Sequence, residues 1–282
     1  MKPLILQSDF GLDDGAVSAM HGVAYSVNEN LPIHDLTHNI PPYDVWEASC
    51  RLVQTVNYWP EGSVFVSVID PGVGSQRLSV VALTKTGHYI VTPDNGTLTH
   101  LATTFGIREA REIDESINRL PGSGESYTFH GRDIYAYTGA RLASGTITLD
   151  GVGPKVPVDS IVSLPITRPK REGTQVTGTI DTHDVRYGSL WTNIPRPLFR
   201  ELGIAHGEYA LAHIANEGED VYSAPLRYGR SFADVSVGEA LIYVNSLDNM
   251  AIAINRGSFA KAYNVGQGTH WTVDFTYPIT GM

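Results

Sequence analysis

The chain has 282 residues, of which 42% are apolar, and its formal net charge is −10. This length allows one large domain or two modest ones. The shortage of Lys and Arg, 20 in total, argues against binding to a nucleic-acid backbone. A lone cysteine, Cys50, excludes an internal disulfide and is expected to be a buried thiol. No apolar run reaches the about 18 residues of a membrane span, and residues 1–7 lead directly into a strand pattern. We therefore expect no signal peptide and a cytoplasmic protein.

The first part of the chain alternates between strand and helix patterns. In chain order, the predicted elements are strand 3–7, helix 13–27, strand 32–36, helix 43–58, strands 64–69, 78–84 and 88–92, helix 95–105 and helix 133–143. Such alternation favours a mostly parallel sheet that helices cover on both faces. The sequence therefore predicts an α/β domain over residues 1–166.

The pattern changes after about residue 166. The charged, turn-rich segment 167–173 is typical of a linker. Beyond it, helix signals are sparse, and strand patterns follow at 175–181, 190–194, 208–214, 240–244, 250–254 and 271–275. Short strands separated by Gly and Asn indicate a small all-β domain, so we predict a barrel-like second domain over residues 174–282.

Three residues in the first domain form a candidate catalytic set. Asp70 and Arg77 bracket a Pro-Gly-Val-Gly turn between two predicted strands, and this turn could bring their side chains to one rim. A neighbouring Arg would keep the aspartate ionised. His130 precedes Gly131 and a predicted helix, whose N-terminus disfavours a charged imidazole. Together these groups can hold and deprotonate a water molecule. Taken singly, they also fit an ordinary turn, a solvated arginine and a core or capping histidine.

Asp9 is a candidate ligand for a sugar. It ends the first predicted strand, and ligands bind outside the carboxyl ends of strands in α/β sheets. Its carboxylate could accept hydrogen bonds from two ribose hydroxyls, although an N-cap or turn aspartate fits equally well. The segment 11–15 carries acidic residues where a phosphate would be repelled. The expected ligand is therefore a nucleoside without phosphates, which argues against NAD, FAD and ATP.

The second domain contributes candidates for recognition. Trp191 lies in a strand pattern and is either a stacking platform for a base or a core tryptophan. Asp181 ends the preceding strand and could pair with an ammonium group. Tyr243 and Ser246 lie at another strand end and can donate hydrogen bonds.

No metal site is expected from the spacing of the histidines. His34, His38, His130 and His183 are scattered and lack a His-Glu-x-x-His or Cys-x-x-Cys frame. A metal-dependent hydrolase that uses His130 with Asp133 remains an alternative.

Six short motifs, taken in order, resemble one known family. They are Ser8-Asp9-Phe10-Gly11, Val68-Ile69-Asp70-Pro71-Gly72-Val73-Gly74, Thr92-Pro93-Asp94-Asn95-Gly96, Phe129-His130-Gly131-Arg132-Asp133, Trp191-Thr192-Asn193-Ile194 and Asn255-Arg256-Gly257. As an ordered set over essentially the whole chain, they are similar to the S-adenosyl-L-methionine hydroxide adenosyltransferases. These hydrolases are related to fluorinase and chlorinase.

The resemblance implies a fold, an assembly and a reaction. It implies an N-terminal α/β domain and a C-terminal β-barrel in a homotrimer, with each site between the N-terminal domain of one subunit and the C-terminal domain of its neighbour. Asp70, Arg77 and His130 match the family's water-activating triad. The reaction would convert S-adenosyl-L-methionine to adenosine and methionine without a cofactor. The positions implied to bind substrate are Asp9, Asp94, Asn95, Phe129, Gly131, Asp181, Ser189, Trp191, Tyr243, Ser246, Ile254 and Arg256.

Three departures from the family pattern affect recognition of the substrate. Ser189 stands where relatives often carry Asn, the segment 182–187 is longer than in the halogenases, and Leu247 replaces an Arg of the fluorinase. Two alternative functions are a regulator that binds the nucleoside without turnover and a halogenase. An ionised Asp70 would repel a halide and so disfavours the halogenase.

Overall fold

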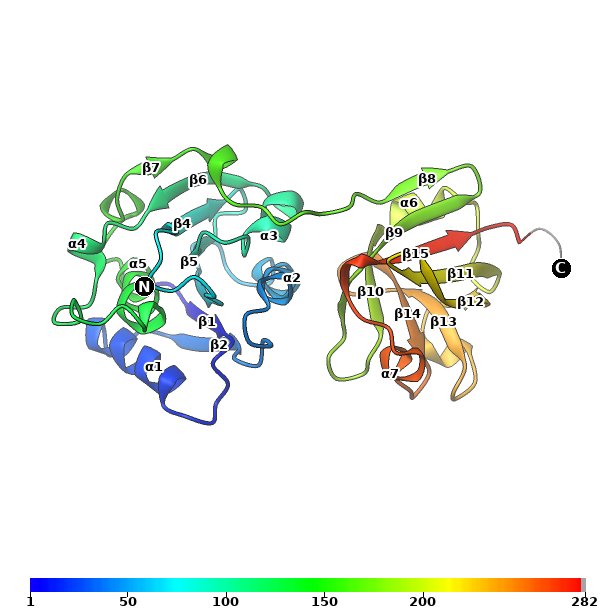
Figure 1. Ribbon diagram of the computed structural model, residues 1–282, viewed down its shortest axis with the longest axis horizontal. Helices are drawn as coiled ribbons and strands as arrows, with labels where there is room; N and C mark the ends of the chain where they lie inside the picture. The colour runs from blue at the N-terminus through cyan, green and yellow to red at the C-terminus, as the bar shows by residue number, and fades with distance from the viewer. Residues whose placement is uncertain (280–282) are drawn as a thin grey trace. The chain divides into compact units, whose positions relative to one another are not determined.

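The computed structural model describes residues 1–279 and separates into two units, Met1–Leu164 and a second unit that begins at Pro165 (Figure 1). The helices and strands of the first unit alternate, whereas the second unit consists almost entirely of strands. The predicted fold class is confirmed. No helix among the described residues is long and apolar enough to cross a membrane.

The first unit is built on a seven-stranded sheet with the strand order β2-β1-β3-β5-β4-β6-β7. Strands β2, β1, β3 and β5 run parallel, while β4 is antiparallel to both of its neighbours, β5 and β6. The strands are β1 (Leu4–Ser8), β2 (Ile33–Thr37), β3 (Val64–Val68), β4 (Ser79–Thr84), β5 (Tyr89–Pro93), β6 (Ile107–Glu112) and β7 (Lys155–Val156).

Helices cover both faces of this sheet, because alternate residues of each buried strand point to opposite sides. Leu4 and Leu6 of β1 pack with α1 and α5, whereas Ile5 packs on the other side with α2 and α3. The α-helices are α1 (Ala16–Val27), α2 (Val45–Val56), α3 (Thr99–Thr104), α4 (Glu115–Asn118) and α5 (Tyr137–Ser144). A π-helical turn, η1 (Gly131–Ala136), directly precedes α5. Two short 3-10 turns, η2 (Leu149–Gly151) and η3 (Val158–Ser160), follow α5.

The second unit is a closed barrel of seven strands. Its sheet runs β10-β14-β13-β12-β11-β15-β9, and β9 also pairs with β10, which closes the ring. Closure leaves no unpaired edge except where β8 adds to β9. The strands are β8 (Lys170–Glu172), β9 (Gln175–His183), β10 (Leu190–Pro195), β11 (Tyr209–Asn216), β12 (Glu219–Tyr228), β13 (Ala240–Val244), β14 (Asn249–Ile254) and β15 (Gly268–Thr276). Short helices α6 (Arg196–Arg200), η4 (Phe232–Asp234) and α7 (Phe259–Tyr263) lie between them.

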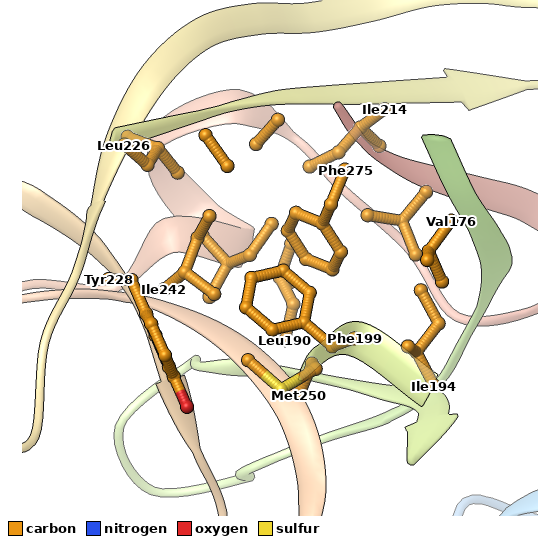
Figure 2. Packing of buried hydrophobic residues seen from close by; sticks show 14 of the residues in the cluster. Val176, Leu190, Ile194, Phe199, Ile214, Leu226, Tyr228, Ile242, Met250 and Phe275 are labelled. Carbon is orange, nitrogen blue, oxygen red and sulfur yellow. The ribbon is translucent and has the colours of Figure 1, made fainter. Parts of the chain in front are cut away.

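Aromatic and branched side chains fill the barrel. Phe199 from α6 packs edge-on against Phe275 of β15, with ring centroids 5.3 Å apart, and Leu190, Ile242 and Met250 surround them (Figure 2). All five side chains are buried, and every residue of this core cluster comes from the second unit.

The structure corrects several predicted elements. Strands β6 and β12 were missed, because charged residues interrupt the apolar pattern of β6 and acidic residues and Pro225 interrupt that of β12. The predicted linker 167–173 contains strand β8. The two strands that flank the Asp70–Arg77 turn do not pair with each other, because β5 lies between β3 and β4.

Candidate active site

A cavity of about 270 Å³ lies in the first unit, where the loops after β1 and β3 meet the segment that precedes η1. The carboxyl ends of parallel strands share one edge of a sheet, so residues that follow β1 and β3 converge there. The lining residues are Asp9, Phe10, Pro42, Tyr43, Val68, Asp70, Val73, Thr128, Phe129, His130 and Gly131.

Asp70 and Arg77 form a two-pronged ion pair at this edge. Because β4 is antiparallel, it begins near the edge where β3 ends, and this brings Arg77 back to Asp70. Arg77 Nε donates to Asp70 Oδ1 at 2.7 Å, and Nη2 donates to Oδ2. The Asp70 side chain is only 6% exposed and the Arg77 side chain only 11%. Burial would lower the pKa of Arg77, but the hydrogen bond to Asp70 and nearby acidic groups raise it overall. The guanidinium therefore stays charged.

His130 lies between two guanidinium groups. Its Nδ1 is 3.2 Å from Arg77 Nη2, and its Nε2 is 3.3 Å from Arg119 Nη2. Burial lowers the pKa of His130, the two arginines lower it further, and Glu115 and Asp70 oppose them. A neutral imidazole accepts a hydrogen bond at one ring nitrogen only. Only one of the two guanidinium contacts can therefore be a hydrogen bond to a neutral ring, and the lowered pKa of His130 favours that neutral form in its buried place at the wall of the cavity.

Sequence reasoning missed Arg119. It follows α4, pairs with Glu115 Oε2 at 2.9 Å, and lies over the ring of Tyr127 at 4.7 Å. The spacing of Glu115 and Arg119 is the four residues of a helical ion pair, which was a visible signal for their pairing. Nothing in the sequence indicated that the pair reaches His130.

Two further side chains hold Arg77 from behind. Arg77 Nη1 donates to Ser79 Oγ at 3.0 Å, and that hydroxyl lies 3.0 Å from the buried Tyr135 hydroxyl. The guanidinium therefore has partners on Asp70, Ser79 and His130, and it has little freedom to turn.

Asp9 lines the same cavity as Asp70 and is partly exposed. Its Oδ2 accepts a hydrogen bond from the backbone N–H of Tyr43 at 2.8 Å. Phe10 and Phe129 meet edge to face at 5.7 Å and give the cavity an apolar side. A Cβ on Gly131 would lie 3.0 Å from the Phe10 ring, so only glycine fits this packing without a shift.

Asp94 and Asn95 do not line this cavity. Asp94 Oδ1 accepts from the backbone N–H of Val162 at 2.9 Å, and burial raises its pKa. Asn95 Nδ2 donates to the carbonyl of Ile69 at 2.8 Å and so fixes the backbone directly before Asp70. The structure gives both residues partners within the fold, and their contact with substrate stays a prediction.

In the second unit, Trp191 and Tyr243 lie on the side of the sheet away from the barrel core, where Trp191 is only 7% exposed and Tyr243 is partly buried. Their neighbours in sequence, Leu190 and Ile242, point into the core, so Trp191 and Tyr243 point outward. Both pair across the sheet with Ala251, which therefore lies between the two aromatic side chains. Burial raises the pKa of Tyr243, while the Ser189 hydroxyl and the Trp191 indole that face it lower it. Ser189, Trp191 and Tyr243 thus form one group.

The remaining predicted residues of the second unit lie in strands or turns. Asp181 is in β9 and accepts a hydrogen bond from Thr179 Oγ1 at 2.8 Å. This hydrogen bond lowers the pKa of Asp181, but burial outweighs it and raises the pKa to about 6. Ser246 is exposed in the turn after β13, and Ile254 ends β14. Arg256 follows with a φ of 58° and an exposed side chain.

The metal-dependent alternative gains no support from the geometry around His130. Asp133 is buried and bound to Arg132, whose Nε donates to Oδ1 at 2.6 Å. Within residues 1–279, the only group of His, Cys, Asp or Glu side chains with metal-ligand spacing is His21, Asp35 and His38, and it contains neither His130 nor Asp133.

Comparison with known proteins agrees with this geometry. Residues 4–153 match the SAM hydroxide adenosyltransferase N-terminal domain, and residues 178–272 match the C-terminal domain of the same family. The chain is 35% identical over 277 residues to the (R)-S-adenosyl-L-methionine hydrolase of Thermus thermophilus, covering 95% of this chain and 98% of that protein. It is 34% identical over 267 residues to the hydrolase of the same name from Salinispora tropica, covering 93% of each.

A relative with lower sequence identity and a solved structure also match almost the whole chain. A fluorinase from Actinopolyspora mzabensis is 29% identical over 293 residues, covering 95% of each chain. The crystal structure of an uncharacterized conserved protein from Thermotoga maritima superimposes with a TM-score of 0.88 at 31% identity, covering 97% of this chain and 99% of that one. The resemblance drawn from the sequence motifs is confirmed, and the chain belongs to the SAM hydroxide adenosyltransferase family.

Proposed function

We propose that this chain hydrolyses S-adenosyl-L-methionine to adenosine and L-methionine by attack of water on C5′ of the ribose. The observation that carries the proposal is the connected set of Asp70, Arg77 and His130, of which Asp70 and His130 line a cavity that Asp9 also lines. Relatives named (R)-S-adenosyl-L-methionine hydrolase, which align over almost the whole chain, support it.

The chemistry requires a better nucleophile rather than an acid. When the new C5′–O bond forms, the C5′–S bond breaks and its electron pair returns to sulfur, which leaves as a neutral thioether. No proton donor is therefore needed for the leaving group, whereas the attacking water must lose a proton. Arg77 would stabilise the developing hydroxide, and the neutral His130 would hydrogen-bond it or take its proton. Asp70 would hold Arg77 in place.

Recognition would be divided between the two units. Asp9 would accept hydrogen bonds from the ribose hydroxyls, and the outward-facing Trp191 and Tyr243 would contact the base. A homotrimer with sites completed between neighbouring subunits is part of this proposal, as is the cytoplasmic location. Holding the reactants in line would provide the entropic part of the acceleration.

Chromatography of products tests the reaction. The protein is incubated with S-adenosyl-L-methionine, with or without EDTA and with or without chloride. Adenosine and methionine in equal amounts, unaffected by either addition, are the expected products. A chloride-dependent halogenated adenosine would instead identify a halogenase, and substrate retained without product would identify a binding protein.

A further inference from the structure

A second group of polar side chains lies outside the cavity and comes from helix α1 and the end of strand β2. Figure 1 labels these two elements. His21 belongs to α1, Asp35 belongs to β2, and His38 follows β2 directly. One potential ligand atom from each residue lies within 4.8 Å of the other two. Two imidazoles and one carboxylate therefore converge from two consecutive elements of the fold.

The distances are close to those of a metal centre. His21 Nε2 is 2.8 Å and His38 Nε2 is 3.0 Å from the same atom, Asp35 Oδ1. Ligands at about 2.0–2.1 Å from a tetrahedral Zn²⁺ are roughly 3.3 Å apart, so these atoms need to separate by only a few tenths of an ångström. The side chains of His21 and Asp35 are 28% and 42% exposed. A metal ion could therefore enter from solvent and keep a water ligand.

The buried histidine is oriented as a ligand. His38 Nε2 has no hydrogen-bond partner, because it faces Asp35 outside hydrogen-bonding geometry, and its side chain is only 2% exposed. Its other nitrogen, Nδ1, lies 2.7 Å from Ser8 Oγ. If the Nδ1 proton is donated to Ser8 Oγ, Nε2 carries a lone pair and lies 3.0 Å from Asp35 Oδ1. A buried lone pair beside a carboxylate oxygen favours a cation that both atoms can bind.

We propose that His21, Asp35 and His38 bind a divalent transition-metal ion of the Zn²⁺ type, with Ser8 as the outer partner of His38. Two imidazoles and a carboxylate suit Zn²⁺, Co²⁺ or Ni²⁺ better than Mg²⁺ or Ca²⁺, which prefer oxygen ligands. The ion would tie α1 to β2. It would also brace the loop after β1, because the N–H of Gly11 donates to the carbonyl of His38 at 2.8 Å. This role is structural and does not depend on the proposed reaction.

Calorimetric titration with ZnCl₂ tests the site. The wild type, His21→Gln and His270→Gln are each freed of metal with EDTA and desalted. Each protein is then titrated with ZnCl₂ at pH 7.5. We expect one Zn²⁺ per chain in the wild type and an affinity at least about tenfold lower in His21→Gln, a loss that even an outer partner can cause. His270, with a side chain 73% exposed beside Glu217, is the matched control and should bind like the wild type.

Two further measurements make the test decisive. Co²⁺ should give the visible absorption of a tetrahedral centre in the wild type but not in His21→Gln, and Zn²⁺ should raise the thermal midpoint of the wild type and of His270→Gln but not that of His21→Gln. Asp35→Asn replaces His21→Gln if the latter fails to fold, since the Asp35 side chain is more exposed. No zinc binding by the wild type, or equal binding by both site variants and the control, would overturn the proposal.

Discussion

The two candidate regions of the molecule differ in their chemistry. In the first unit, charged groups surround His130: the Asp70–Arg77 pair on one side and the Glu115–Arg119 pair on the other. On the side of the barrel sheet away from the core, Ser189, Trp191 and Tyr243 group hydroxyls and aromatic rings around a small alanine, and the first two residues are buried. The first arrangement suits the control of a developing charge, and the second suits recognition of a flat, uncharged group. In the proposed function, the first unit therefore supplies the groups that activate water, and the second unit supplies the contacts to the base.

The largest effect is expected from Asp70→Asn. The change leaves the buried Arg77 without its counter-ion, so turnover should fall by roughly 10²–10⁴-fold with a much smaller effect on KM. Adenosine formation under saturating substrate measures it. Asp150→Asn is the matched control, because Asp150 also pairs with an arginine, Arg111, but is not among the residues that line the cavity. Full activity of Asp70→Asn would contradict the assigned role.

Lowering the pH should change the free energy of unfolding in opposite directions through His100 in the first unit and His213 in the second. Burial lowers the pKa of His100 to about 4 from an ordinary value of 6.5. The unfolded chain therefore binds more protons between these values, and the free energy of unfolding falls as the pH decreases from about 6.5 to 4, by up to about 3 kcal/mol. Hydrogen bonds that His213 donates to the carboxylates of Asp220 and Asp274 instead raise the pKa of His213 despite its partial burial. The contribution of His213 to the free energy of unfolding is therefore complete at pH values below its pKa in the unfolded chain. It is lost as the pH rises through its higher pKa in the folded protein.

Urea unfolding at pH 7 and pH 5 separates these contributions. Trp46 lies 4.6 Å from the His100 ring, between centroids, so its fluorescence reports on the first unit. We expect His100→Gln to flatten the acid loss of stability in that unit and His213→Gln to leave it unchanged. An identical pH dependence in wild type and His100→Gln would show that His100 is not the group responsible.

Trp191→Ala should weaken substrate binding rather than chemistry. Loss of one stacking surface costs about 1–3 kcal/mol, which corresponds to a rise in KM of roughly 5- to 150-fold with little change in kcat. Trp191→Phe keeps an aromatic face and should recover most of the affinity. A drop in kcat with unchanged KM would instead place the indole in the chemical step.

The smallest effects are expected from the ion pair behind His130, and their signs are opposite. Arg119 lowers the pKa of His130 and Glu115 raises it. If activity requires neutral His130, the rate falls as the pH decreases through its pKa. Arg119→Gln should therefore move the acid limb of the kcat profile to higher pH, and Glu115→Gln should move it to lower pH. Shifts of the same sign in both variants would exclude this electrostatic role for the pair.

Some of the site could be predicted because its signals are local. Asp9 and Asp70 each follow an apolar strand, and strand ends of an α/β sheet gather ligands at one edge. Both residues do line one cavity. The positions of Asp94 and Asn95, by contrast, could not be derived from the same rule. Whether a strand-end residue faces a cavity or anchors a neighbouring loop depends on what packs beside it.

The sequence by itself determined the class of each unit and the family. Continuous apolar runs indicate strands that are buried on both faces, short strands between Gly and Asn indicate a barrel, and the ordered motifs indicate the family. Only the tertiary structure decided that β5 lies between β3 and β4, that Arg119 reaches His130, and that His21 meets His38. The physical reason is that periodicity tells which face of an element is buried, whereas strand order and helix placement decide which distant segments share that burial.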